Sequence, residues 1–353
     1  MALPPSNTSL TYASPSATPH LTYTPLKPPA PNQLIIKVLA TAVNPCDIQL
    51  WHSPLVSWGR FGREGTMGWD YSGTIAAVGD QLKGKWEVGD EAAQGTFTKH
   101  LTISDKAPIA RKPKCWTFEE AASVPLVTLT AFACLDRLPP LKPTVAQRRV
   151  IVAGASGGTG MWCVQLAKKV YNCHVLAICS GRNKDFVKEL GADDIIDYTT
   201  SNLPQALPNH MPGGLRFDLY IDCVGGTEMF GIWVGALVNI LHKEGAYITI
   251  VGDKTSRTVP GPPLTYFTYP TQIFRHMWGW ISGPRYAAII LYNESKYLEK
   301  VAKLAEKGEV RVVVQETIEG ILEQGKDKVA WERANALLEE GRIRGKVVLK
   351  IQD

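Results

Sequence analysis

The chain has 353 residues, a length that suggests two domains rather than a single core. Hydrophobic residues make up 45% of it and charged residues 20%, which is typical of a globular protein. The formal net charge of +5, without any block of like charges, is too weak to indicate a nucleic-acid partner.

Cysteine usage and the N-terminal composition favour the cytoplasm. There are seven cysteines, an odd number, and none forms a CxxC pair, so a reduced compartment fits better than a disulfide framework. No basic stretch followed by an apolar one opens the chain, and no Lys or Arg precedes Lys27. No apolar run approaches the length of a membrane-spanning helix.

The first part of the chain is rich in short β-type stretches separated by turns that contain glycine. Strands are expected at 34–40, 71–78 and 97–103, after a hairpin formed by 9–12 and 20–23. These elements predict a mostly-β, partly antiparallel domain over about residues 1–125.

From about residue 126 to 310, strand and helix patterns alternate, which predicts a doubly wound parallel sheet covered by helices on both faces. An apolar helix at 121–135 precedes this region. The expected strands are 149–153, 174–179, 195–196, 219–223 and 246–251, and the expected helices are 160–171, 184–190 and 229–241. A helix at 330–340 and a strand at 346–351 follow, and this last strand is expected to complete the sheet of the first domain, with about 311–353.

The strongest chemical signal is a Gly-rich turn between a strand and a helix. The apolar strand at 150–153 runs into residues with little or no side chain, namely Gly154, Ser156, Gly157, Gly158, Thr159 and Gly160. Such residues let the backbone approach a pyrophosphate, and the helix N-terminus supplies free N–H groups. The spacing departs from GxGxxG, and a tight turn can need glycine for its backbone angles alone. Because a βα series follows, dinucleotide binding is the favoured interpretation.

The end of the second strand favours NADP(H) over NAD. NAD-specific chains usually carry an acid there for the ribose 2′-hydroxyl, whereas this chain carries Ser180, Arg182 and Lys184. A hydroxyl and two cations suit a 2′-phosphate. The alternative is that these residues are only the solvated first turn of a helix.

Two later strands are also followed by glycine, at the strand ends where such folds bind ligands. Val224 and Gly225 follow one strand, and Val251 and Gly252 follow the other. We assign these four residues to the cofactor site, against the alternative that they are ordinary loop residues.

From about Leu34 to Ile351 the chain resembles the medium-chain dehydrogenase/reductase superfamily. Within it, the chain is most similar to the zinc-independent quinone oxidoreductase-like branch, which includes fungal enoyl reductases and is similar to Yim1-type proteins. The landmarks are Ala42-Val43-Asn44-Pro45-Cys46-Asp47, Gly68-Trp69-Asp70-Tyr71-Ser72-Gly73, Trp86-Glu87-Val88-Gly89-Asp90-Glu91, the Gly-rich turn, Leu190-Gly191-Ala192-Asp193 and Gly345-Lys346-Val347-Val348-Leu349.

The resemblance implies a split GroES-like domain and a Rossmann domain, with the active site in a cleft between them. It implies that Asn44 lies near the nicotinamide and the substrate, and that Thr130 lines the nicotinamide side. Lys184 and Tyr198 would approach the 2′-phosphate, and we also assign Lys346 to the cofactor.

No catalytic metal is expected. Zinc-dependent relatives carry a Cys and a His where this chain has Asn44 and Trp69, and Cys46 and Asp70 alone do not make a zinc site. The sequence does not identify the group that donates the proton. His52 is a candidate, although a lone histidine in such a loop more often serves packing or lies on the surface.

The sequence therefore predicts an NADPH-dependent oxidoreductase that transfers a hydride to an enone, a 2-enal or a quinone, as a monomer or a homodimer. The alternative is a catalytically weak, reductase-like NADPH-binding protein on lipid-droplet or membrane surfaces. That alternative draws on residues 260–292, which carry Phe267, Phe274, Met277, Trp278, Trp280 and Tyr286. This aromatic segment suits a substrate pocket, a dimer interface, a lipid surface with Arg275 and Arg285 near head groups, or ordinary core packing.

Overall fold

The computed structural model describes residues 3–54, 64–94, 97–143, 145–230, 237–254, 269–289 and 291–351. The chain divides into two compact units. Unit 1 contains residues 1–127 and 293–353, and unit 2 contains residues 128–292. Residues 293–310, which we had expected in the cofactor-binding domain, thus belong to unit 1.

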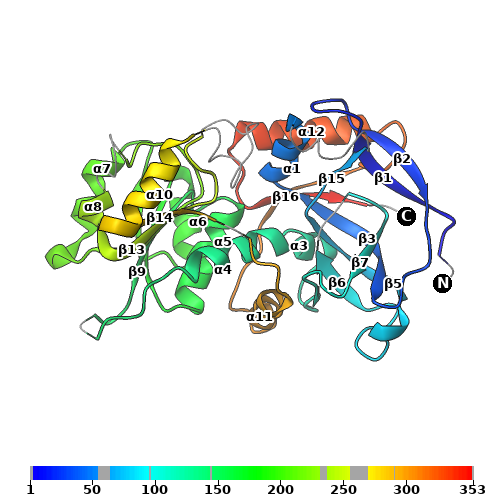
Figure 1. The fold of residues 1–353 in the computed structure, drawn as a ribbon, viewed down its shortest axis with the longest axis horizontal. Coiled ribbons are helices and arrows are strands. Elements are labelled where there is room, and N and C mark those ends of the chain that lie inside the picture. Colours follow the sequence, from blue (N-terminus) through cyan, green and yellow to red (C-terminus); the bar gives the residue numbers. More distant parts are fainter. Residues whose placement is uncertain are drawn as a thin grey trace. The chain divides into compact units, whose positions relative to one another are not determined.

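Unit 1 is built on a seven-stranded sheet whose members come from both ends of the chain (Figure 1). The strands of this unit are β1 (Ser6–Tyr12), β2 (His20–Pro25), β3 (Gln33–Val43), β4 (Gly65–Thr66), β5 (Asp70–Val78), β6 (Glu91–Gln94), β7 (His100–Ser104), β8 (Ala110–Arg111), β15 (Val314–Glu319) and β16 (Lys346–Lys350). The helices are α1 (Pro45–Trp51), α3 (Phe118–Ala122), α11 (Ser295–Glu306) and α12 (Asp327–Glu340), with a 3-10 turn at Asp80–Leu82.

The main sheet has the order β15-β16-β3-β5-β6-β8, and β7 also pairs with β3. As expected from the sequence, the C-terminal strand β16 joins this sheet, antiparallel to β3. The predicted N-terminal hairpin is confirmed as β1 and β2, which with β4 form a separate small sheet. Ile36, Val38, Tyr71 and Leu349 are among the buried side chains of the core between these elements.

Unit 2 is a six-stranded parallel sheet, so the predicted α/β fold class is confirmed. Its strands are β9 (Arg149–Ala153), β10 (His174–Cys179), β11 (Asp194–Asp197), β12 (Phe217–Asp222), β13 (Leu241–Thr249) and β14 (Arg285–Ala288). Its helices are α5 (Gly158–Lys169), α6 (Lys184–Glu189), α7 (Leu203–Ala206), α8 (Leu237–Ile240) and α10 (Thr271–Ser282), with 3-10 turns at Gly181–Asn183, Leu207–His210 and Pro212–Gly214. Helix α4 (Pro125–Leu135) begins in unit 1 and ends in unit 2.

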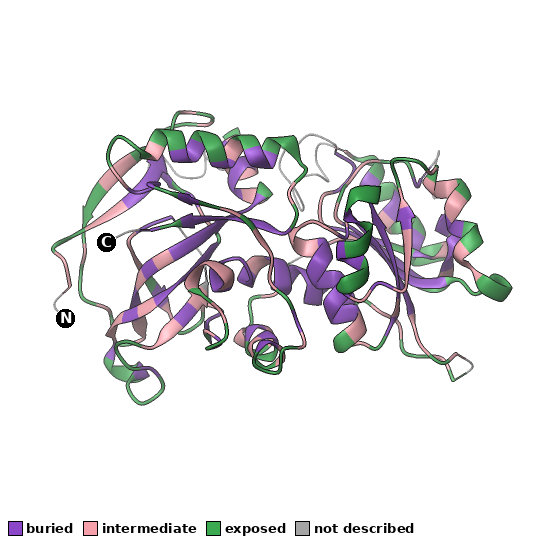
Figure 2. Ribbon diagram, turned by 180° about the vertical axis from the view of Figure 1, so that it is seen from behind, coloured by how far each residue is buried: buried purple, intermediate pink, exposed green. Residues whose placement is uncertain are grey.

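The strand order β11-β10-β9-β12-β13-β14 corresponds to the order 3-2-1-4-5-6 of a Rossmann domain. Every residue of β9 and β12 is buried, because side chains on both faces of a parallel sheet are covered. Figure 2 shows the central strands of unit 2 largely in the colour of buried residues. The order of strands reverses between β9 and β12, and in such folds ligands bind at the carboxyl ends of the strands near this point.

Three predicted elements differ in the structure. The helix expected at 121–135 is broken into α3 and α4 before Pro125, since proline disfavours helical geometry in the residue that precedes it. Strand β13 begins at Leu241 rather than at 246, and its first residue pairs with Phe217 of β12 across a register shift. Only α8 represents the helix expected at 229–241, of which residues 231–236 lie outside the described residues.

Candidate functional site

The Gly-rich turn of unit 2 joins β9 to α5 as the sequence predicted. Gly154 has a φ of 72°, a left-handed conformation that favours glycine. A Cβ at Gly160 would lie 2.1 Å from the carbonyl oxygen of Gly154, so only glycine fits there. Gly157 is the N-cap of α5, and Gly158, Thr159 and Gly160 form its first turn. The first N–H groups of this helix have no partner within it, which makes the turn suited to a phosphate.

A side chain that the sequence analysis did not select ties this turn to the end of β10. Asn183 is buried, and its Nδ2 donates to Ser156 Oγ at 3.0 Å and to Ser180 Oγ at 3.1 Å. Arg182 and Lys184 lie on either side of Asn183 and are exposed. The structure therefore brings the expected hydroxyl and both cations to one edge, beside the Gly-rich turn.

A carboxylate also lies at this edge, and sequence reasoning missed it. Asp197 ends β11 and is in register with Cys179, the residue that precedes Ser180. Its Oδ1 accepts from the N–H of Thr199 at 2.9 Å and from the Thr199 hydroxyl at 2.6 Å, and these hydrogen bonds hold the pKa of Asp197 below its ordinary value. Its other oxygen lies against Gly181, whose N–H also contributes to the lowered pKa. The ionised carboxylate is thus engaged by protein donors.

The remaining residues assigned to the cofactor in unit 2 lie on four segments. Tyr198 follows β11 and is 56% exposed, whereas Thr130 is buried on α4. Val224 and Gly225 follow β12, and Val251 and Gly252 follow β13, at the same carboxyl edge of the sheet as the Gly-rich turn. A Cβ on Gly154 would lie 3.0 Å from Cγ2 of Val224, so the loop after β12 contacts the turn.

Unit 1 contains a buried polar cluster that joins three segments distant in sequence. The Lys346 ammonium donates to Val43 O at 3.1 Å, to Asp70 Oδ2 at 3.2 Å and to Asn44 Oδ1. Asn44 Nδ2 donates to Asp70 Oδ2 at 2.8 Å and to Ala42 O at 3.3 Å. The expected donation from Asn44 to a substrate, or from Lys346 to the cofactor, would therefore require the release of one of these bonds.

Asp47 is a second buried carboxylate beside this cluster. Its two oxygens accept from the N–H groups of Asn44 at 2.7 Å and Gly68 at 3.0 Å, so it joins the start of α1 to the loop before β5. The pKa of Asp47 is raised from the ordinary 3.8 to about 7. Burial is the largest cause and the nearby Asp70 also raises the pKa, whereas Lys346 lowers it. The cluster holds the Asn44 and Asp70 segments in one fixed arrangement.

This arrangement does not fit a zinc ion. The candidate ligand atoms of Asn44 and Asp70 both contact the Lys346 ammonium, and a dication placed among them would meet a positive charge. Among the described residues, no group of three or more His, Cys, Asp or Glu side chains has the arrangement of a metal site. We therefore derive no chemical step through a metal.

His52 lies at the end of α1 in unit 1. Its Nδ1 is 2.6 Å from Ser16 Oγ, and its ring centroid is 4.4 Å from that of Trp51. The structure thus places His52 beside the loop between β1 and β2. The neighbouring residues 55–63 lie outside the described residues.

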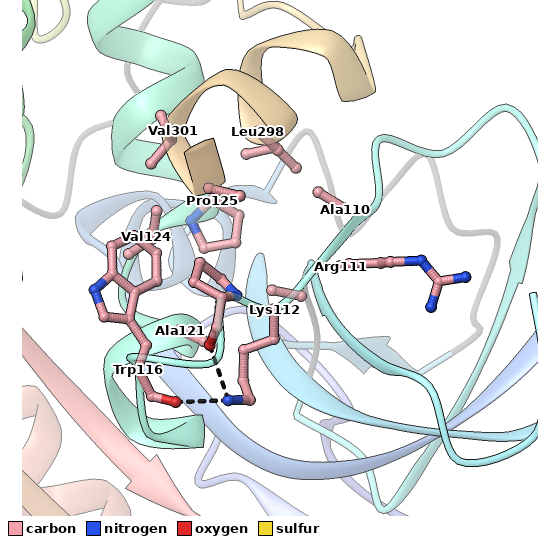
Figure 3. A pocket seen from close by; sticks show the side chains of 12 residues that line it. Ala110, Arg111, Lys112, Trp116, Ala121, Val124, Pro125, Leu298 and Val301 are labelled. Carbon is pink, nitrogen blue, oxygen red and sulfur yellow. Dashed lines mark hydrogen bonds between the residues drawn. The ribbon is translucent and has the colours of Figure 1, made fainter. Parts of the chain in front are cut away.

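Figure 3 shows a crevice in unit 1 between α11 and the segment from β8 to α4. Trp116, Pro125, Leu298 and Val301 line it, and the Lys112 ammonium donates to Trp116 O at 2.6 Å. Its interior of about 20 Å³ has room for about one water molecule, so it is too small for a substrate.

Comparison with known proteins identifies two family models. The "Alcohol dehydrogenase GroES-like domain" matches residues 30–119, and the "Zinc-binding dehydrogenase" family matches residues 190–349. No helix in the described part of the chain has the length and apolar character needed to cross a membrane.

Curated relatives match along almost the whole chain. The NAD(P)H oxidoreductase RTN4IP1, mitochondrial, of Mus musculus is 30% identical, over 91% of this chain and 82% of its own. The trans-enoyl reductase pgmF of Aspergillus terreus is also 30% identical, over 92% of this chain and 87% of its own. Among solved structures, the quinone oxidoreductase from Coxiella burnetii has the same fold, with a TM-score of 0.77 and 22% identity over 98% of this chain and all of its own.

Proposed function

Because the chain belongs to the medium-chain dehydrogenase/reductase superfamily, in its quinone oxidoreductase and enoyl reductase-like branch, we propose that it is an NADPH-dependent reductase. Its proposed acceptors are enones, 2-enals or quinones. The family assignment supports oxidoreductase chemistry with a nicotinamide cofactor, and the choice of NADPH and of the acceptor is our inference.

One observation carries the choice of NADPH. At the edge where a 2′-phosphate would lie, Ser180, Arg182 and Lys184 stand beside the Gly-rich turn, and the carboxylate of Asp197 is engaged by Thr199 and Gly181. A carboxylate committed to protein donors is a poor acceptor for a ribose hydroxyl, whereas two exposed cations attract a phosphate. This edge therefore favours the phosphorylated dinucleotide.

The residues of the chain would bind and orient the cofactor. The N–H groups at the start of α5 would hold the pyrophosphate, and Ser180 would donate to the 2′-phosphate, with Tyr198 beside it. Thr130, Val224, Val251 and Gly252 would border the nicotinamide, which supplies the hydride when bound. We propose that Asn44 orients its segment through Asp70 and Lys346. His52 is the candidate proton donor, and the pH profile of turnover tests this role.

The acceptor class is suggested by chemistry and by relatives. The buried cluster of unit 1 does not fit a Lewis acid, so hydride transfer to an acceptor that is already electron-poor suits the site better than oxidation of a plain alcohol. The printed names of relatives include a trans-enoyl reductase and a quinone oxidoreductase. Oxidation of NADPH, followed at 340 nm, with a panel of 2-enals, enones and quinones tests the proposal, and turnover of none of them would refute it.

The cofactor choice has its own test. Replacing Arg182 and Lys184 together by Ala removes two cations from the 2′-phosphate, and we expect NADPH to bind about 10- to 100-fold more weakly while NADH binding changes less than twofold. Calorimetry with both nucleotides measures this. Lys188→Ala on α6 is a matched control, because Lys188 donates to Asp193 O away from this edge. Equal losses for NADPH and NADH would contradict the assignment.

A second candidate function, attachment to a lipid surface, is favoured by the orientation of helix α10. Its polar side faces inward: Gln272 is buried, and Arg275 pairs with Asp253 at 2.5 Å. Its apolar side faces outward, and the exposed fractions run from 44% to 76% for Ile273, Phe274, Met277, Trp278, Trp280 and Ile281. Such an exposed apolar face marks an interaction site rather than core packing.

The charges near this helix favour an anionic surface. No Asp or Glu occurs between Lys254 and Asn293. Arg285 and Lys243 are exposed near the C-terminal end of the helix, where Gly283 lies against the Lys243 backbone. Tyr286, by contrast, is buried on β14, and Phe267 lies outside the described residues. Of the aromatic segment, Tyr286 therefore serves the core, and α10 presents the apolar face.

Flotation with vesicles tests this second candidate. We expect vesicles containing phosphatidylserine to carry the protein, neutral vesicles to carry less, and Phe274→Ser with Trp280→Ser to abolish flotation. Val329→Ser, at a residue of α12 that is 67% exposed, is the control for a single exposed apolar side chain. A dimer in solution that the α10 variant dissociates, without any flotation, would assign this face to self-association.

The compartment is a further proposal. We expect the cytoplasm from composition, while the mouse relative named above carries the word mitochondrial in its name. Fractionation of cells that express the full chain from its natural start distinguishes the two locations.

A further inference from the structure

Asp222 and Thr249, which the sequence analysis did not select, end the neighbouring strands β12 and β13. They are directly paired in the parallel register and are 3% and 1% exposed. Each stands immediately before one of the two loops assigned to the cofactor. Neither side chain is therefore accessible to a ligand, although each lies next to a loop that is assigned to the cofactor.

The Asp222 carboxylate holds the first loop. Its Oδ1 accepts from the N–H groups of Val224 and Gly225, both at 2.9 Å. Its other oxygen, Oδ2, accepts from the hydroxyl of Thr249 at 2.9 Å. The Tyr247 hydroxyl also donates to this carboxylate. Asp222 thus links the loop after its own strand to the end of the next strand.

The Thr249 hydroxyl holds the second loop. While donating to Asp222, its oxygen accepts from the N–H groups of Val251 at 3.2 Å and Gly252 at 2.8 Å. One carboxylate and one hydroxyl therefore accept hydrogen bonds from four backbone N–H groups and so orient two loops. A hydrogen bond to a charged acceptor contributes more than a neutral one, and its loss leaves a buried group unpaired.

The two loops contact each other, and the loop after β12 also contacts the Gly-rich turn. Gly226 N donates to Gly252 O at 3.3 Å. A Cβ on Gly225 would lie 2.5 Å from Lys254 O and 2.7 Å from Cγ1 of Val251. Val224, 60% exposed, lies against Gly154. A shift in either loop would therefore displace the other loop as well.

We propose that Asp222 and Thr249 form a clamp that fixes both loops and thereby positions the nicotinamide half of NADPH. This inference rests on the proposed function. Both are positioning residues, because they act through the backbone of Val224, Gly225, Val251 and Gly252. We assign the adenosine half to the start of α5 and the Ser180 edge, whereas the hydrogen bonds of Asp222 and Thr249 described above go to the two loops and to each other.

This separation of the two halves gives a test. Thr249→Val keeps the shape of the side chain but removes the hydroxyl, and Thr249→Ser restores it. We expect Thr249→Val to weaken NADPH binding about tenfold and to change binding of adenosine 2′,5′-bisphosphate less than twofold, measured by calorimetry. Thr249→Ser is expected to bind NADPH within about twofold of the unaltered protein.

A second carboxylate on the same strand provides the matched control. Asp218 lies at the other end of β12, is 6% exposed and accepts from Arg149 N at 2.8 Å. We expect Asp222→Asn to weaken NADPH selectively, and Asp218→Asn to lower the thermal midpoint without changing the affinity for either ligand.

Two results with the variants would overturn the clamp: equal weakening of NADPH and bisphosphate binding by Thr249→Val, or an Asp218→Asn variant that loses as much NADPH affinity as Asp222→Asn. If the unaltered protein binds the bisphosphate and NADPH with equal affinity, the nicotinamide half gains nothing from these loops and the clamp is refuted. If it binds neither ligand, the proposed function itself is refuted, and the clamp with it.

Discussion

Unit 1 buries the charged side chains Asp47, Asp70 and Lys346 in one cluster, whereas unit 2 exposes Arg182 and Lys184 at its proposed cofactor edge. A buried charge is costly unless it is paired, so removing a partner from the cluster destabilises the fold. An exposed charge costs little and remains available to a ligand, although salt screens it. The buried charges of this cluster in unit 1 therefore fix a conformation, whereas the exposed charges at the edge of unit 2 lie where the proposed binding needs them.

The largest effect is expected from Lys346→Met. This change leaves the buried Asp70 carboxylate without its ammonium partner and lowers the free energy of unfolding by about 3–5 kcal/mol. Lys350→Met is the control, because Lys350 lies on the same strand in an exposed pair with Glu119 at 3.6 Å, for which we expect a loss below about 1 kcal/mol. Urea unfolding measures both. Equal losses of unfolding free energy in the two variants would contradict the claim that the buried ion pair stabilises the fold more than the exposed one.

The next effect concerns pH. In the folded chain Asp47 keeps its proton up to about pH 7, whereas in the unfolded chain it releases the proton near its ordinary pKa of 3.8. The unfolded state thus binds fewer protons between these values, so stability falls as pH rises through this window and stays low above it. The rise of about three units corresponds to about 4 kcal/mol at most.

Asp47→Asn removes this titration, and the readout is the slope of unfolding free energy against pH between 4 and 8. We expect the variant to lose most of the decline, even though the lost hydrogen bond lowers its stability at every pH. An unchanged slope would show that the decline arises at other groups.

A smaller effect is expected from Gly160→Ala in unit 2. The new Cβ meets the Gly154 carbonyl oxygen at 2.1 Å, and relieving this clash costs about 1–3 kcal/mol and displaces the pyrophosphate turn. Gly157→Ala is the control, since its new Cβ has 3.4 Å to the nearest atom. Thermal unfolding distinguishes them, and a Gly157 variant destabilised as much as the Gly160 variant would contradict the steric argument.

The parts that local sequence patterns determine could be predicted. Strands β9 and β10 have the predicted bounds, because apolar runs bounded by glycine or polar residues form buried parallel strands. The Gly-rich turn was also recognisable, because its requirement for small residues lies within seven consecutive positions.

The remaining features depend on contacts between distant residues. Lys346 and Asn44 are 302 positions apart, and nothing near either residue indicates that they meet. The orientation of helix α10, with its apolar residues outward and its polar side buried, could not be predicted, because an amphipathic pattern does not say which face of a helix is covered. Asp197 was missed because it approaches Gly181 only through the pairing of β10 with β11.

The pairing of β16 with β3 has a consequence for the order of events during synthesis. Residues 128–292 form one uninterrupted stretch, so a ribosome would release all of unit 2 before it made the strand that completes the sheet of unit 1. Domains generally fold as units while the chain emerges. We expect unit 2 to reach its native state on the nascent chain, whereas the N-terminal part of unit 1 completes its sheet only after β16 has been translated.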